Sequence, residues 1–186
     1  MSVTKLATRY AKSLLDLSLE KSNLETVYKD ITDFSGTVQN NRDLYLLLKS
    51  PIINPDKKQA ILKKVFGDSF DPITNAFFDI IVRKRREAYL PEIASEFISQ
   101  YKDNKSIVQA KLVTATAVDD SLLATVRSIV IEHTNCKEVE LSISTDPTIL
   151  GGFILQFQDK LYNASLTGKL DVLGKQFQEN EYIKKY

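Results

Sequence analysis

His133 and Cys136 are the residues whose types could most readily support chemistry, and they lie close together near the end of a predicted helix. Both are zinc ligands, but a zinc site uses three or four protein ligands, and this sequence holds one histidine and one cysteine. General acid–base catalysis would need a positioned partner for His133, and its neighbour Glu132 points elsewhere on a helix. Nucleophilic catalysis by Cys136 would need an activating base, which the sequence does not place. We therefore predict no catalytic, cofactor or metal site and no enzyme activity.

A second candidate is the turn that begins at Asp146-Pro147. The aspartate side chain can accept hydrogen bonds from backbone groups two residues on, and the proline fixes φ. Gly151-Gly152 then permits positive φ or a close backbone approach where the next strand begins. No Lys-Ser or Lys-Thr follows the glycines, as a phosphate-binding loop requires, and the carboxylate series of a calcium loop is missing. We interpret this turn as structural.

A third candidate is the basic cluster Arg83-Lys84-Arg85-Arg86, which could contact phosphates or anionic lipid headgroups. The cluster falls in the last turn of a predicted helix, where cations complement the helix dipole and stay solvated. The net charge of +1 also argues against a dedicated nucleic-acid-binding protein. A nucleic-acid binder stays as a distant alternative, and we predict protein partners instead.

The elements that would carry these residues divide the chain into two parts with different periodicities. Apolar residues recur at helical spacing as far as Tyr101, and short alternating runs begin at Ile107. Prolines preceded by capping side chains, at Pro55 and Pro72, mark helix starts. Six helices are expected, at 4–21, 24–40, 43–49, 55–66, 72–87 and 91–102. They predict an N-terminal six-helix bundle over residues 1–105.

The second part is predicted to be a small α/β domain over residues 106–186, which gives an α+β multidomain fold class. Three strands of a short sheet are expected, each with one shared face: Val108, Ala110 and Leu112; Val139, Leu141 and Ile143; Phe153, Leu155 and Phe157. Two helices are expected beside it, one around Leu122 to Val130 and one at the C-terminus. The C-terminal stripe consists of Leu166, Leu170, Leu173 and Phe177. We favour a core role for this stripe, because a short sheet must bury one face, and a binding role stays open.

The first and fifth helices carry more apolar residues than a helix packed on one side requires. The residues in question are Leu6, Tyr10, Leu14 and Leu17 in the first helix and Ile73, Phe77, Ile80 and Ile81 in the fifth. Two such helices side by side would form a groove for an amphipathic helix from a partner. The alternative is that both helices are central in the bundle and surrounded by their neighbours.

Motifs spread over most of the chain support a family resemblance. They are Ala7-Thr8-Arg9-Tyr10-Ala11, Arg85-Arg86 before Leu90-Pro91, Asp146-Pro147 with Gly151-Gly152, then Asp159, Asn163 and Ser165. With these motifs the chain resembles the delta subunit family of F-type ATP synthases, the counterpart of the mitochondrial oligomycin sensitivity conferring protein. It departs from the family pattern at Gln158, where a glycine is usual, and at Asn163, where an aspartate is usual. An asparagine can still cap the final helix, whereas glutamine suits a positive-φ turn less well than glycine.

The resemblance implies a non-catalytic peripheral-stalk (stator) subunit of a proton-translocating ATP synthase. Its N-terminal domain would bind the N-terminal helix of an alpha subunit, and its C-terminal domain would bind the b-type stalk subunits. By position, the residues corresponding to the alpha-binding site are Tyr10, Ser13, Leu14, Phe77 and Ile80. An aspartate at Ser13 or Phe77 is then expected to weaken binding without unfolding the domain.

The sequence also bears on where the protein works. No run approaches the roughly 18 consecutive apolar residues of a membrane span. No secretion or organelle-targeting extension precedes Ala7, so we expect peripheral association with the cytoplasmic face of a bacterial inner membrane. An alternative function is a generic helix-binding adaptor of another complex.

Overall fold

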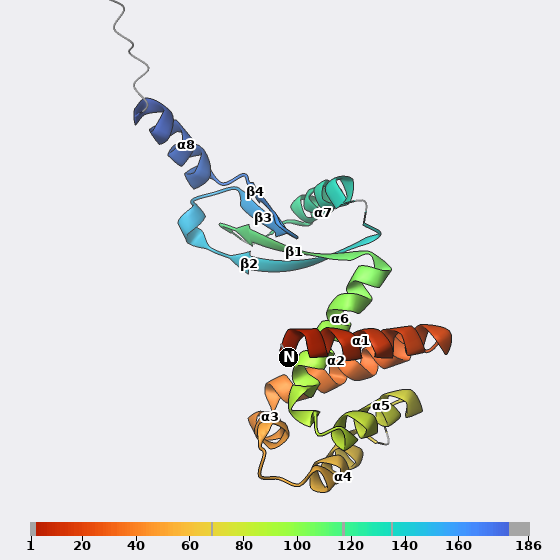
Figure 1. Cartoon of the computed structure of the whole chain (residues 1–186). Coiled ribbons are helices and arrows are strands. Elements are labelled where there is room, and N and C mark those ends of the chain that lie inside the picture. The colour runs from red at the N-terminus through yellow and green to blue at the C-terminus, as the bar shows by residue number, and fades with distance from the viewer. Residues whose placement is uncertain (1–2, 68, 117, 135, 179–186) are drawn as a thin grey trace, which may run out of the picture. The chain divides into compact units, whose positions relative to one another are not determined.

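The fold is mostly helical with a small four-stranded sheet (Figure 1). The computed structural model describes residues 3–67, 69–116, 118–134 and 136–178. Contacts divide the chain into two compact units, unit 1 (Met1–Asn104) and unit 2 (Lys105–Tyr186). Among the described helices, none combines the length and the apolar character that crossing a membrane requires.

Unit 1 is built from helices. They are α1 (Val3–Glu20), α2 (Leu24–Asn40), α3 (Arg42–Lys49), α4 (Pro55–Phe66), α5 (Pro72–Arg83), the short 3-10 helix η1 (Glu87–Tyr89) and α6 (Leu90–Lys105). The expected bounds of α2 and α4 are those observed. The expected extension of the fifth helix to residue 87 is wrong, because the chain leaves the helix after Arg83 and Arg85 adopts a left-handed φ of 56°.

The core of unit 1 centres on Phe34 of α2, which is fully buried. Its ring lies 5.5 Å from that of Phe66 and 4.9 Å from that of Phe78, so α2 packs against α4 and α5 at one point. On another side of α2, the ring of Tyr28 stacks on that of Tyr101 from α6 at 3.8 Å. Aromatic burial of this kind holds α2 at the centre of the unit.

The N-terminus of α5 is fixed by carboxylates. Asp71 caps its own helix, with Oδ1 accepting from the backbone N–H of Ile73 at 2.8 Å. The buried Asp30 of α2 accepts at Oδ2 from the backbone N–H of Asp71 at 2.8 Å and from the Thr74 hydroxyl at 2.9 Å. Negative charge is favourable at a helix N-terminus, so these contacts hold α5 against α2.

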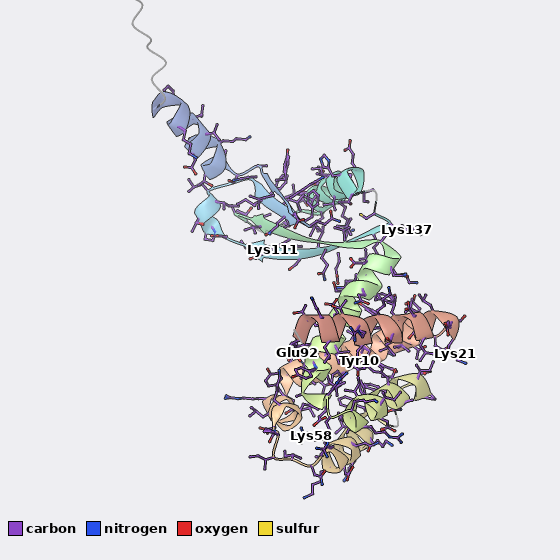
Figure 2. All side chains as sticks on the ribbon, in the orientation of Figure 1. Tyr10, Lys21, Lys58, Glu92, Lys111 and Lys137 are labelled. Atoms are coloured by element: carbon purple, nitrogen blue, oxygen red, sulfur yellow. The ribbon has the colours of Figure 1, made fainter. Side chains whose placement is uncertain are left out.

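A buried ion pair joins three further elements of unit 1. Lys58 of α4 (labelled in Figure 2) is its cation. Its Nζ donates to Glu87 Oε1 of η1 at 2.9 Å and to the Leu48 carbonyl oxygen of α3 at 3.0 Å. The lysine is 1% exposed and the glutamate 7%. At this burial each charge depends on the other, since water cannot solvate either one alone.

Unit 2 is a sheet with helices. Its elements are β1 (Ile107–Thr114), α7 (Asp120–Thr134), β2 (Glu138–Thr145), the 3-10 helix η2 (Pro147–Ile149), β3 (Phe153–Phe157), β4 (Lys160–Asn163) and α8 (Leu166–Gln178). The strand order is β2-β1-β3-β4, with β1 parallel to β2 and the other pairs antiparallel. The sequence missed β4, which has four exposed residues and no alternating burial.

Helix α7 covers one face of this sheet and closes the core of unit 2. The core contains Ala110 and Leu112 of β1, Leu155 and Phe157 of β3, Val126 and Val130 of α7, and Cys136. The faces expected for the first three strands are confirmed for β1 and β3, where alternate residues are buried. On the opposite face Gln109, Lys111 and Gln156 are exposed, while Val113 and Ile154 are partly buried.

The Lys58–Glu87 pair gives a stability prediction. Lys58→Met is expected to lower the free energy of unfolding by about 3–5 kcal/mol, because Glu87 would remain buried without a cation. The double variant Lys58→Met/Glu87→Leu should recover most of this loss. Lys63→Met, which breaks the exposed Lys63–Asp79 pair, should cost less than about 1 kcal/mol. Urea unfolding followed by circular dichroism measures all three, and equal losses for the two single variants would contradict the prediction.

Candidate functional site

The two helices expected to form a partner site meet at Tyr10. The Tyr10 ring of α1 lies edge-on to the Phe77 ring of α5, with ring centroids 6.4 Å apart (Figure 2). The structure therefore brings the first and fifth helices together, as a shared surface requires. The tyrosine ring is only half-buried, so one side of this junction faces solvent.

The nine residues predicted to bind a partner fall into two groups that differ in burial. Three are core residues of unit 1: Leu14, Phe77 and Ile81. Six keep part or much of their surface accessible: Leu6, Tyr10, Ser13, Leu17, Ile73 and Ile80. We call these six the α1/α5 surface. Leu17 is 40% exposed and Ile80 is 50% exposed, which is high for large apolar side chains.

Phe77 supports this surface from beneath. Its ring is 8% exposed, so Phe77→Asp would bury a charge and is expected to unfold the unit. The sequence-based expectation of an intact fold therefore does not hold for this position. For Ser13 it stays a prediction, which agrees with the exposure of this residue and with a hydroxyl that donates to the Arg9 carbonyl of its own helix.

Arg86 contacts this site, although the sequence places it only in a basic cluster and in the Arg85-Arg86 motif. Helix α5 ends in a Schellman turn, in which Arg85 N–H donates to Val82 O at 2.8 Å and Arg86 N–H donates to Ile81 O at 3.1 Å. This turn takes Arg86 out of the helix, and its Nη1 donates to the Tyr10 hydroxyl at 2.5 Å. The sequence predicts all four basic residues in a solvated last turn, and this is wrong for Arg86, because α5 ends at Arg83.

A second candidate surface lies on α8. Leu166, Leu170, Leu173 and Phe177 recur at spacings of four, three and four residues, the pattern of a coiled-coil seam. We call these four residues the α8 seam. Leu170 is 58% exposed and Phe177 is 85% exposed. The favoured core role for this stripe is wrong, because α7 and the sheet already form the core of unit 2 without it.

The turn after β2 positions the start of α8. Asp146 Oδ1 accepts from the Thr148 hydroxyl at 2.7 Å and from its backbone N–H at 2.9 Å, and these bonds lower the pKa of the Asp146 carboxyl. The Leu166 N–H then donates to the Gly151 carbonyl at 3.0 Å. Gly152 has a φ of 75°, and a Cβ there would lie 2.3 Å from the Ala164 carbonyl oxygen. The structural interpretation of this turn is confirmed.

Asn163 and Gln158, the two residues that depart from the family pattern, still fill the local roles expected of aspartate and glycine. Asn163 Oδ1 accepts from the Ser165 N–H at 3.0 Å, and Ser165 Oγ in turn accepts from the Gly168 N–H at 3.0 Å, so the pair caps α8. Gln158 adopts a positive φ of 49° between β3 and β4, the conformation that glycine would favour.

The remaining chemical candidates are the buried Cys136 and the exposed His133. Cys136 is buried in the core of unit 2, and the ring of His133 lies parallel to that of Phe157 with centroids 6.4 Å apart. Within the described ranges, no cluster of three or more His, Cys, Asp or Glu side chains could hold a metal ion.

The comparisons with known proteins agree with one another on a single family. The family model "ATP synthase delta (OSCP) subunit" matches residues 6–177. The ATP synthase subunit delta of Christiangramia forsetii is 35% identical over 185 residues, covering 100% of both chains. That of Cytophaga hutchinsonii is 34% identical over 179 residues, covering 96% of this chain and 97% of the relative. A chain of the Toxoplasma gondii mitochondrial ATP synthase hexamer shares the fold, with a TM-score of 0.71 and 22% identity over 93% of this chain and 97% of that one.

Two glycine substitutions in unit 2 are expected to have opposite effects on stability. Gly152→Ala is expected to lower the stability of unit 2 by about 1–3 kcal/mol, because the added methyl meets a carbonyl oxygen at a left-handed φ. Gly174→Ala is the matched control, since a Cβ there meets nothing within 4 Å, and it should stabilise α8 by about 0.5–1 kcal/mol. Thermal unfolding of both variants checks this, and a Gly152→Ala protein as stable as the parent would refute the role of the turn.

Proposed function

The chain belongs to the ATP synthase delta (OSCP) subunit family, and on that premise we propose which of its surfaces hold which partners. The resemblance inferred from the sequence motifs is thereby confirmed. The protein is a non-catalytic subunit of the peripheral stalk of F-type ATP synthase. It links the catalytic head to the b-type stalk and resists rotor torque during ATP synthesis. The observation that carries this function is the family match over nearly the whole chain.

In this proposal residues 1–105 bind the catalytic head. Helices α1 to α6 act as one bundle, and the α1/α5 surface receives the N-terminal helix of an alpha subunit. Exposed Leu17 and Ile80, together with the half-buried Tyr10, support this assignment, because they supply apolar contact area on two adjacent helices. Leu14, Phe77 and Ile81 hold the two helices in place beneath the partner.

Residues 106–186 bind the stalk in this proposal, through the α8 seam. A helix with exposed apolar residues at coiled-coil spacing fits another helix with the same pattern, and the b-type subunits supply long helices. The turn at Asp146 and Gly152 fixes the start of α8 and so aims the seam.

The protein is associated with the membrane peripherally, through the complex. We place it on the cytoplasmic face of a bacterial inner membrane, in line with its bacterial relatives. A generic adaptor of another complex would use the same surfaces, but the family match favours the ATP synthase.

The head-binding role is tested with two surface variants. Ser13→Asp and Ile80→Asp are each expected to weaken binding of an alpha N-terminal peptide by about tenfold or more, because each places a carboxylate in the apolar contact. Lys12→Gln is the control, since it makes the same change in net charge at an exposed position about 100° around α1 from Ser13. Calorimetric titration measures the affinities, and thermal melts verify folding. Binding that both variants leave unchanged would remove the α1/α5 surface from the proposal.

The stalk-binding role is tested on α8. Leu170→Glu and Phe177→Glu are expected to abolish binding to a soluble b-type stalk fragment while leaving the melting temperature within a few degrees of the parent, because both side chains are exposed in the free protein. Lys175→Gln makes the same charge change on the opposite side of α8 and should bind normally. If both glutamate variants bind like the parent in ultracentrifugation, the seam is not the stalk site.

A further inference from the structure

Arg86 brings a positive charge to the α1/α5 surface, and no carboxylate among the described residues forms an ion pair with it. Its Cζ lies 5.5 Å from the centroid of the Tyr10 ring, and its Nη1 donates to the hydroxyl of the same side chain. The ion pairs among the described residues join other groups, and the adjacent Glu87 is held by Lys58. Arg86 is partly buried, so its charge is less well screened than that of its exposed neighbours.

The guanidinium also keeps unused donors. It carries five N–H groups in a planar fork, and the Tyr10 hydroxyl accepts one contact. The other donors can bind a carboxylate through two parallel hydrogen bonds. Because Tyr10 already orients the side chain, little rotamer entropy would be lost when such a carboxylate arrives.

The position of Arg86 makes the two ends of the α1/α5 surface chemically different. Ile73, Phe77, Ile80 and Lys84 share one face of the α5 cylinder, so the apolar stripe of α5 runs into a cation at its C-terminal end. Arg86 lies at that end as well, on the side of Tyr10. The opposite end of α5 is occupied by the carboxylate of Asp71. The surface is therefore apolar along its length and basic at one end.

We propose that Arg86 is a specificity-determining residue that binds an aspartate or glutamate of the incoming helix, at the end of that helix's apolar face. The inference rests on the proposed function, since it concerns the helix that the α1/α5 surface receives. Apolar contacts alone would accept a helix in either direction. A single charge pair at one end favours the direction and register in which the carboxylate meets Arg86.

The test is a mutant cycle between full-length protein and a synthetic peptide covering the N-terminal helix of the alpha subunit. Each peptide aspartate or glutamate is replaced singly by asparagine or glutamine. Arg86→Gln is expected to weaken binding about tenfold or more, and one peptide variant should lose as much. Combining these two changes should cause no further loss. Arg85→Gln, which removes an exposed charge from the same turn, should stay within about twofold of the parent.

A further variant separates charge recognition from support of Tyr10. Tyr10→Phe removes the hydroxyl that Arg86 contacts but keeps the ring and the guanidinium, so it should weaken binding much less than Arg86→Gln. Equal losses for these two variants, with no peptide carboxylate coupled to Arg86, would overturn the inference. The peptide substitutions leave the protein unchanged, so they test the charge pair even if Arg86→Gln lowers stability.

The result also distinguishes this inference from the proposed function. If the parent peptide binds and Arg86→Gln behaves like Arg85→Gln, the charge recognition is wrong while the α1/α5 surface stands. If the parent peptide does not bind at all, the head-binding role fails and the inference fails with it.

Discussion

The placement of α5 is the constraint on which the proposed head-binding surface depends. One end of this helix is tied to α2, because the buried Asp30 carboxylate accepts hydrogen bonds from the Asp71 N–H and the Thr74 hydroxyl. The other end closes in a turn with Arg85 at a positive φ, which leads the chain back toward α1. Between these ends α5 cannot slide or rotate without breaking buried polar contacts, and such contacts are costly to lose. The apolar side chains of α1 and α5 therefore meet in one register, with Tyr10 at the junction.

Unit 2 exposes the α8 seam, its proposed stalk-binding surface, because its core is complete without that helix. Helix α7 and one sheet face complete a core around Leu112, Val126 and Leu155, and the other face mixes polar residues with the partly buried Val113 and Ile154. The core of unit 2 forms without α8, and the four residues of the α8 seam stay exposed along the helix. A row of four large apolar side chains in water is unfavourable for a monomer. In the proposed stalk contact it would supply the contact area that a long-lived helix–helix interface needs.

The sequence predicts most of this fold where the decisive interactions are local. Helix α4 begins at Pro55 behind an asparagine, and the turn at Asp146 forms hydrogen bonds within its own residues, so both are encoded in adjacent positions. The errors arise where the deciding contact is distant. Periodicity marks Leu170 and Phe177 as apolar, but it cannot tell whether the covering surface belongs to the same chain or to a partner. The end of α5 depends on a positive φ at an arginine, which residue type does not predict.

The residues of the candidate site also differ in whether local sequence or distant contacts decide their role. Helical spacing groups Leu14 with Tyr10, yet one is buried and the other is half-exposed, because the neighbouring helices decide how much of the stripe they cover. Arg86 lies outside the helix, so no helical pattern could assign it to this surface. For a stator subunit the two kinds of residue serve different needs. Apolar area slows dissociation under torque, whereas one oriented charge lowers the energy of a single docking direction. Because a misoriented link would strain the stalk at every turn of the rotor, a surface that is apolar along its length and charged at one end suits this role better than a longer apolar strip.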